Sequence, residues 1–239
     1  MRIAIVSDIH GNRTAFEAVL ADLQHMAPDL VLHGGDLADA GSSPAEIVDR
    51  VRALGWQGVA GNTDEMLWSP ESLTRFADQT PSMQPLLSTI QEMSAWTREE
   101  LGEERLAWLR ALPRMQTHGA VALVHASPES VWRAPAAEAS DAELEAVYGP
   151  LDHDIAIYAH IHRPFIRTVS SAIVANTGSV SLPYDGDPRA AYLLLDEGAP
   201  HIRRITYDVA KELKNLADCK IPHADWIEKT LTTGSFQMP

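Results

Sequence analysis

The chain has 239 residues, a hydrophobic content of 45% and a formal net charge of −14. Its length is enough to bury a sizeable core, and its composition is typical of a globular protein. The acidic balance argues against non-specific nucleic-acid binding, which needs a basic surface. One cysteine, Cys219, excludes an internal disulfide and makes a cytoplasmic location the expectation. The sequence shows neither a signal peptide nor an apolar run long enough to span a bilayer, so we expect no membrane partner.

The first 60 residues alternate between strand-like and helix-like patterns. Continuous apolar runs at 3–7, 30–33 and 56–60 predict strands that are buried on both faces. Helical spacing follows the first run from Phe16 to Ala27, and a second helix begins at Pro44. This β-α-β-α-β order predicts a largely parallel sheet with right-handed crossovers.

The pattern changes twice after this α/β half. Residues 63–112 predict two or three helices, which we interpret as a helical insertion that shapes one wall of any site. From residue 116 onward strands predominate, with one helix at about 141–148, and they suggest a second sheet stacked on the first. The expected strands are 120–125, 155–159, 165–169, 172–175, 190–195 and 202–207. A C-terminal tail at about 209–239 is helical and then irregular, and we treat 1–239 as a single domain.

Seven residues that can bind a metal ion lie at or just after the end of a predicted strand. They are Asp8, His10, Asp36, Asn62, His125, His160 and His162. Because ligands of open α/β sheets bind at the carboxyl ends of the strands, we expect these side chains to converge on one edge. Two carboxylates, four imidazoles and one amide suit Mn²⁺, Fe or Zn²⁺ better than Ca²⁺.

Seven ligands are too many for one such ion and fit two ions that share a carboxylate. Two divalent ions bring four positive charges, of which Asp8 and Asp36 neutralise two. The resulting pocket favours an anion, and two-metal sites of this kind activate water for in-line displacement at phosphorus. We therefore expect hydrolysis of a phosphate ester by attack of a metal-bound hydroxide, with Mn²⁺ as the first choice of metal and Fe or Zn²⁺ as alternatives.

The order of these motifs resembles that of the calcineurin-like metallophosphoesterase family. The motifs are Asp8-x-His10, Gly35-Asp36-x-x-Asp39, Gly61-Asn62, His125 and His160-x-His162. The segments 176–179 and 184–189 are similar to the small bacterial branch of phosphoesterases and diadenosine-tetraphosphatase-like proteins. The resemblance implies an α/β fold, a four-layer α/β/β/α sandwich.

The same resemblance implies how the metal ligands are shared. It places Asp8, His10 and His162 on one metal and Asn62, His125 and His160 on the other, with Asp36 bridging. We assign Asp36 and Asn62 as catalytic residues. Many family members have a histidine after the Gly-Asn pair that protonates the leaving group, whereas this chain has Thr63, a poor proton donor. The sequence therefore does not identify the residue that protonates the leaving group.

Three further residues are candidates for binding the substrate. Asn12 precedes a predicted helix and can contact a phosphate there, although a helix cap is an equal alternative. Asp39 can orient a ligand or simply start a helix, and Arg163 can hold a phosphate or form a surface salt bridge.

For three other residues near the motifs, we expect a structural role before a functional one. Trp68 and Trp132 can stack on a nucleobase, but core packing is the more frequent role of such residues. His33 most simply ends a strand.

The sequence leaves the substrate open among phosphomonoesters, phosphodiesters and nucleotide phosphoanhydrides. The expected partner is a small phosphorylated molecule, with nucleotides among the candidates, and the oligomeric state is open. The alternative function is a catalytically weak metal-binding scaffold that acts through protein partners. Such scaffolds typically lose ligands, and this chain has all seven.

Overall fold

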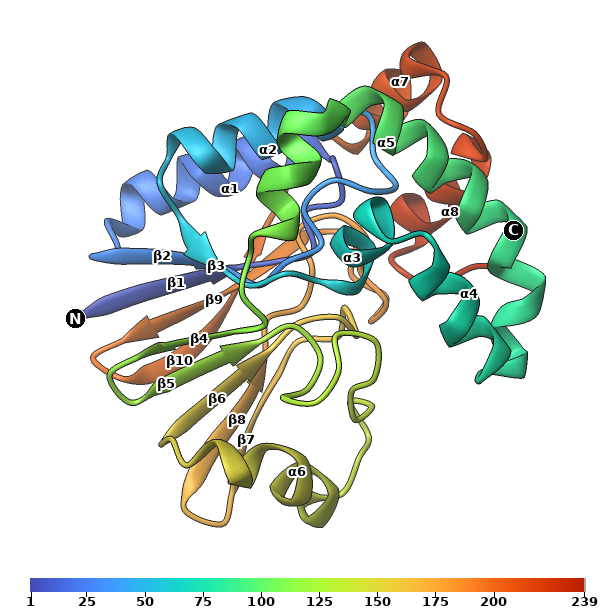
Figure 1. The fold of residues 1–239 in the computed structure, drawn as a ribbon. Helices are drawn as coiled ribbons and strands as arrows, with labels where there is room; N and C mark the ends of the chain where they lie inside the picture. The colour runs from blue at the N-terminus through green and yellow to red at the C-terminus, as the bar shows by residue number, and fades with distance from the viewer. Residues whose placement is uncertain (239) are drawn as a thin grey trace.

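The protein consists of two stacked sheets with helices on their outer faces (Figure 1). The computed structural model describes residues 1–238. The first sheet has the order β10-β9-β1-β2-β3 and the second β4-β5-β6-β8-β7. This arrangement confirms the predicted α/β class and the four-layer sandwich.

The first sheet has a parallel centre, as the β-α-β-α-β pattern predicts. Its strands are β1 (Arg2–Val6), β2 (Leu30–His33), β3 (Gln57–Gly58), β9 (Ala190–Asp196) and β10 (Ala199–Ile205). The pairs β1–β2 and β2–β3 are parallel, while β9 joins the other side of β1 antiparallel. The helices α1 (Arg13–Met26) and α2 (Pro44–Ala53) cover its outer face. The third predicted strand, 56–60, is wrong in length because only two residues pair.

The second sheet mixes parallel and antiparallel pairs. Its strands are β4 (Met115–His118), β5 (Val121–Val124), β6 (Ile155–Tyr158), β7 (Phe165–Val169) and β8 (Ala172–Asn176). The helix α6 (Asp141–Tyr148) and the short 3₁₀ helix η2 (Gly149–Leu151) follow β5, and Leu144 and Tyr148 of α6 pack on this sheet. Strand β4 was not predicted from the sequence.

Separate apolar layers hold the sandwich together. Ile5, Leu32 and Leu123 belong to the layer between the two sheets. Phe16 and Val48 belong to the layer between the first sheet and its helices. Burial of these side chains stabilises the stack by removing apolar surface from water.

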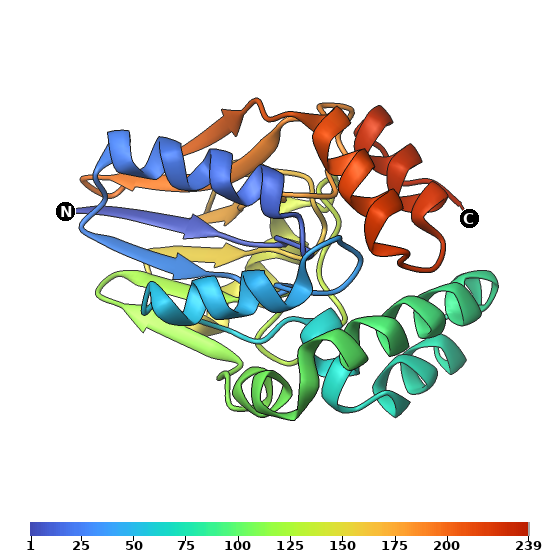
Figure 2. The same ribbon diagram turned by 90° about the horizontal axis from the view of Figure 1, so that it is seen from above.

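The insertion and the tail lie together at the end of the molecule to which β1 and β2 point (Figure 2). The insertion comprises α3 (Asn62–Trp68), α4 (Glu71–Asp78), the 3₁₀ helix η1 (Pro81–Leu86) and α5 (Leu87–Arg110). The tail comprises α7 (Val209–Cys219) and α8 (Ala224–Thr233), followed by irregular chain to residue 238. Helices thus occupy both segments for which the sequence predicts them. Among the described residues, no helix is both long and apolar enough to cross a membrane.

Candidate metal centre

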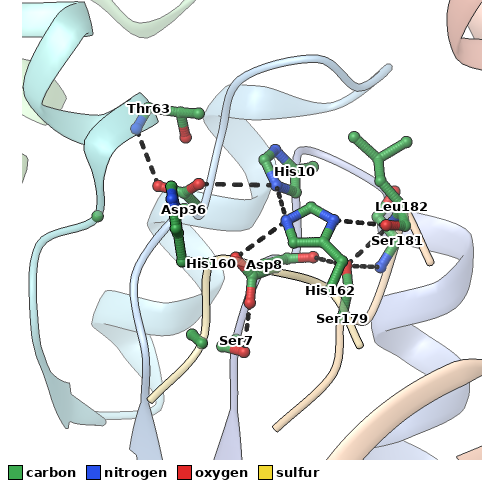
Figure 3. Close-up of polar contacts among 12 residues, drawn as sticks. Ser7, Asp8, His10, Asp36, Thr63, His160, His162, Ser179, Ser181 and Leu182 are labelled. Carbon is green, nitrogen blue, oxygen red and sulfur yellow. Dashed lines mark hydrogen bonds and ion pairs between the residues drawn. The ribbon is translucent and has the colours of Figure 1, made fainter. Parts of the chain in front are cut away.

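All seven candidate ligands come together at the carboxyl ends of the central strands. Asp8 and His10 follow β1, and Asp36 follows β2. Asn62 is the first residue of α3, His125 follows β5, and His160 and His162 follow β6. Figure 3 shows Asp8, His10, Asp36 and His162 pointing toward one another. The site therefore takes ligands from both sheets.

The backbone at this site is held in an unusual conformation. Five of the seven candidate ligands have a positive φ although they are not glycine: Asp8 (53°), His10 (47°), Asp36 (54°), His160 (67°) and His162 (55°). Left-handed backbone is unfavourable for such residues and clusters at functional sites. Backbone hydrogen bonds from Asp8 N to the Gly35 oxygen (3.0 Å) and from His10 N to the Asp36 oxygen (3.0 Å) tie the two loops together.

One group of ligand atoms belongs to Asp8, His10, Asp36 and His162. One atom from each of these four buried residues lies within 4.8 Å of all the others. The Nε2 atoms of His10 and His162 are 3.3 Å apart, and His162 Nε2 lies 3.2 Å from Asp8 Oδ1. Asp36 Oδ2 lies 3.8 Å from His10 Nε2.

A second group of ligand atoms surrounds Asn62. Its Oδ1 lies 3.0 Å from His125 Nε2 and 2.8 Å from His160 Nδ1. Asp36 Oδ2 lies 3.5 Å from His125 Nε2, so this carboxylate is adjacent to both groups.

Hydrogen bonds to backbone carbonyls orient three of the imidazoles. His10 Nδ1 donates to the Asp39 oxygen (2.9 Å), His125 Nδ1 to the Gly34 oxygen (2.7 Å) and His162 Nδ1 to the Leu182 oxygen (2.5 Å). In a neutral imidazole that donates through Nδ1, the lone pair is on Nε2. All three Nε2 lone pairs therefore point into the cluster, as metal ligands require.

The donor set fits divalent metal ions. Imidazole nitrogens, carboxylate oxygens and an amide oxygen converge with separations of 2.8–3.8 Å, an arrangement that a cation stabilises. Asp8 Oδ1 is buried and has no hydrogen-bond partner within residues 1–238. Ser7 Oγ donates to the other oxygen, Asp8 Oδ2, at 2.6 Å. An imidazole-carboxylate set without thiolate suits Mn²⁺, Fe or Zn²⁺.

The protonation states agree with this role. Burial alone would raise the pKa of Asp8, but the adjacent His162 lowers that pKa to about 2. Burial lowers the pKa of His10, and burial together with nearby His125 lowers the pKa of His160 to about 4. Burial opposes protonation of His162 as well, but the carboxylate of Asp8 raises its pKa. A cation beside Asp8 would favour the neutral, metal-binding form of His162.

Asp64 supports the site but was not identified from the sequence. Its carboxylate accepts hydrogen bonds from the backbone N–H groups of Asp36 (2.8 Å), Leu37 (3.0 Å) and Gly61 (2.9 Å). Burial and the nearby Asp36 raise its pKa to about 6. Its position as the third residue of α3, where an acid can bond back to the helix start, is the signal that could have revealed it.

Comparison with known proteins agrees with the site. The calcineurin-like phosphoesterase superfamily domain matches residues 1–198.

The chain belongs to the calcineurin-like phosphoesterase superfamily.

The similar proteins cover this chain to different extents. An uncharacterized protein of Methanocaldococcus jannaschii is 27% identical over 97% of this chain and 98% of its own. A metallophosphoesterase from Sphaerobacter thermophilus has a crystal structure that is 27% identical, with a TM-score of 0.79, covering 98% of this chain and 99% of that one. A symmetrical bis(5'-nucleosyl)-tetraphosphatase of Aromatoleum aromaticum is 34% identical over 62% of this chain and 52% of that protein. Membership of the calcineurin-like superfamily and the buried Asp/His cluster identify the chain as a metal-dependent phosphoesterase.

A cavity of about 310 Å³ opens beside this phosphoesterase centre. His10, Asp36, Asn62 and His160 form part of its wall, and insertion helices form another part, as expected. The tail also contributes, through α8, which the sequence did not predict.

The proposed substrate-binding residues lie in different surroundings. Asp39 is buried and lines the cavity, and burial raises its pKa to about 7. Asn12 is fully buried and caps α1, accepting a hydrogen bond from Ala15 N at 2.9 Å, so the structure shows its capping role. Arg163 is exposed and donates to Glu138 (2.5 Å) and to the Tyr184 oxygen (2.9 Å), and it is not part of the cavity wall.

Of the two tryptophans and His33, only Trp132 lies at the cavity. Trp132 lines the cavity, whereas Trp68 packs against the helix layer with the Arg110 guanidinium 5.6 Å from its ring centre. His33 ends β2, and its ring lies 6.1 Å from that of Trp108 on the helix side of the sheet. It contributes no atom to the cluster.

Proposed function

We propose that this phosphoesterase uses two divalent metal ions to hydrolyse a small phosphorylated substrate. The observation that carries the proposal is the position of Asp36, whose Oδ2 lies near histidines of both groups, at 3.8 Å from His10 and 3.5 Å from His125. A carboxylate placed in this way is suited to bridge two ions.

The ligands divide between the two ions as the family pattern suggests. Asp8, His10 and His162 would hold one ion, and Asn62, His125 and His160 would hold the other, with Asp36 available to both. Bound ions supply an activated water molecule and positive charge against the phosphoryl oxygens. The chain fixes three of its four imidazoles through the Asp39, Gly34 and Leu182 carbonyls, so these ligands are oriented before the substrate arrives.

The chemistry of the leaving group depends on Thr63. It lines the cavity, and its Oγ1 is buried without a hydrogen-bond partner in the described chain. Because a threonine hydroxyl is a poor acid at neutral pH, we propose that the preferred esters have a leaving group that departs without full protonation.

The metal and the location complete the proposal. We assign Mn²⁺ first, with Fe or Zn²⁺ as alternatives, because the donor set accepts all three and availability decides among them. We also place the protein in the cytoplasm, where a chain whose one cysteine is unpaired remains reduced.

Replacing Asp36 tests the two-metal function. Asp36→Asn keeps the shape of the side chain and removes the shared negative charge. We expect metal content to fall from two ions per chain and hydrolysis of p-nitrophenyl phosphate and bis(p-nitrophenyl) phosphate with Mn²⁺ to fall at least 100-fold. Elemental analysis and steady-state kinetics give the two readouts.

The matched control is Asp225→Asn, on the exposed surface of α8. It makes the same chemical change away from the centre and should retain both metal and activity. An Asp36→Asn protein that keeps both would contradict the proposal. A parent protein that binds metal but hydrolyses neither ester would favour the scaffold function.

A further inference from the structure

The cavity beside the metal centre differs in character from the centre itself. Its wall is built mainly of apolar side chains from segments far apart in the sequence: Phe76 of α4, Met83 of η1, Trp132 of the loop after β5, and Trp226 of α8. The metal-ligand candidates His10, Asp36, Asn62, His160 and His162 form one end of the same cavity. An ester bound through its phosphoryl group at that end must place its organic group against the apolar wall.

A series of aromatic rings leads away from the centre along one side of the cavity. The Tyr184 ring stacks on His162 at 4.5 Å between centroids and 17° between planes. Phe236 meets Tyr184 edge-on at 5.5 Å, and Trp226 meets Phe236 at 6.5 Å. The rings of Phe76 and Trp132, 5.0 Å apart, form another part of the wall. Such rings favour contact with an apolar or aromatic group.

Both indole N–H groups of this wall already donate hydrogen bonds within the protein. Trp132 Nε1 donates to Glu65 Oε2 (2.5 Å), and Trp226 Nε1 donates to the Gln237 oxygen (2.6 Å). The polar edge of a nucleobase placed against these tryptophans would therefore lose its hydrogen bonds to water without replacing them.

The charges of the wall disfavour a polyphosphate. Away from the metal ligands, the wall within residues 1–238 has no Lys or Arg that could hold the further phosphates of a polyphosphate. A volume of about 310 Å³ lies near the lower end for small-molecule sites, which suits one substituted ring better than two nucleosides.

We infer, on the basis of the proposed function, that the substrate is a phosphate ester of one uncharged, apolar, aromatic alcohol. The insertion and the tail select the organic group through the apolar cavity, and the metal centre holds the phosphoryl group. Hydrolysis breaks the phosphorus–oxygen ester bond, water supplies the new oxygen on phosphorus, and the products are the aromatic alcohol and phosphate.

The test is a series of para-alkylphenyl phosphates, from methyl to butyl, assayed with Mn²⁺. The parent phenols have nearly equal acidity, so differences report binding of the alkyl group and not leaving-group chemistry. Burial of each methylene should raise kcat/KM about threefold to fourfold until the cavity is full. Dinucleoside tetraphosphates should react with a lower kcat/KM than any member of the series.

A second readout does not depend on hydrolysis. The corresponding non-hydrolysable arylphosphonates should bind with a Kd that falls by the same factor for each methylene, measured by calorimetry. Met83→Gln should flatten both trends. Met115→Gln, the same change at an exposed position on β4, should leave them unaltered.

The outcomes separate the inference from the function on which it rests. Turnover without a rising trend, preference for a dinucleoside tetraphosphate, or equal effects of the two glutamine variants would overturn the inference. Rising phosphonate affinity without turnover of any ester would support the apolar cavity and overturn the hydrolytic function. Flat affinity and no turnover would overturn both.

Discussion

His33 lies three residues before Asp36 but belongs to the structural part of the molecule. It is fully buried, and within the described residues neither ring nitrogen has a hydrogen-bond partner. Burial lowers its pKa from 6.5 to about 4. The folded protein therefore holds this histidine neutral under conditions in which the unfolded chain binds a proton.

This difference predicts a pH dependence of stability. Because the pKa of His33 is lower in the folded protein than in the unfolded chain, acid favours the unfolded chain, which binds the proton first. The contribution of His33 to the free energy of unfolding is therefore complete above pH 6.5 and is lost as the pH falls toward 4. The shift corresponds to about 3 kcal/mol. The free energy of unfolding of His33→Leu should fall less than that of the parent between pH 7 and 4.5. Urea unfolding across this pH range measures both free energies. A difference in free energy of unfolding between the two proteins that does not change with pH would refute the lowered pKa of His33.

Gly61 lies so close to Asp36 that there is no room for a side chain at this position. A Cβ added there would lie 2.0 Å from Asp36 Oδ1 and 2.7 Å from the Asp36 backbone nitrogen. Because backbone cannot yield easily, we expect Gly61→Ala to displace the Asp36 carboxylate and to weaken metal binding about 10- to 100-fold. Metal titration measures the loss. In Gly149→Ala the new Cβ meets only the end of the Glu145 side chain, at 2.9 Å, so this control should bind metal normally.

At the scale of elements, Glu212 joins the tail to the first sheet's helices. Although it lies on α7, it is fully buried and accepts hydrogen bonds from Thr14 Oγ1 (2.5 Å) and Ser42 Oγ (2.7 Å). The tail in turn supplies Trp226 to the cavity wall. The position of α7 thus bears on the site although it contributes no metal ligand.

Removing this carboxylate should loosen the tail. Glu212→Ala leaves the two hydroxyl groups without their acceptor, and we expect about 2 kcal/mol of lost stability. Amide hydrogen exchange in α7 and α8 should accelerate. Glu228→Ala, on the exposed face of α8, is the control and should change neither quantity by a measurable amount. Unchanged exchange in the Glu212 variant would show that other contacts hold the tail.

Three of the correctly predicted strands share one physical property. Strands β1, β5 and β6 are almost entirely buried, so each reads as a continuous apolar run. Strand β4 is mostly exposed, with Met115 and His118 facing water, and it has no such pattern. Strand β3 pairs through only two residues, which is too short for a periodic signal.

The site was predictable to the extent that strand ends determine it. The loops after β1, β2, β5 and β6 deliver their side chains to one edge, as parallel strands dictate. Residues that depend on tertiary packing gave no comparable signal: Tyr184 stacks on His162 from a distant loop, and Trp226 reaches the cavity from the tail. The apolar cavity could not be read from the sequence for the same reason.

For the whole molecule, the candidate ligands extend from residue 8 to residue 162 and come from both sheets. We predict that the chain unfolds as a single domain and that metal stabilises all of it. Free Mn²⁺ at 100 times its Kd should raise the free energy of unfolding by about 2.7 kcal/mol. Calorimetry with Mn²⁺ and with a chelator measures the change. Two separate transitions, only one of which responds to metal, would contradict the single domain.

The left-handed backbone at Asp8, His10, Asp36, His160 and His162 has a consequence for protein engineering. Each such residue costs on the order of 1–3 kcal/mol relative to relaxed backbone. Glycine would relieve that cost at every one of these positions. A screen for heat resistance alone would therefore reward the loss of the very side chains that bind metal, so selection for stability must be coupled to selection for turnover.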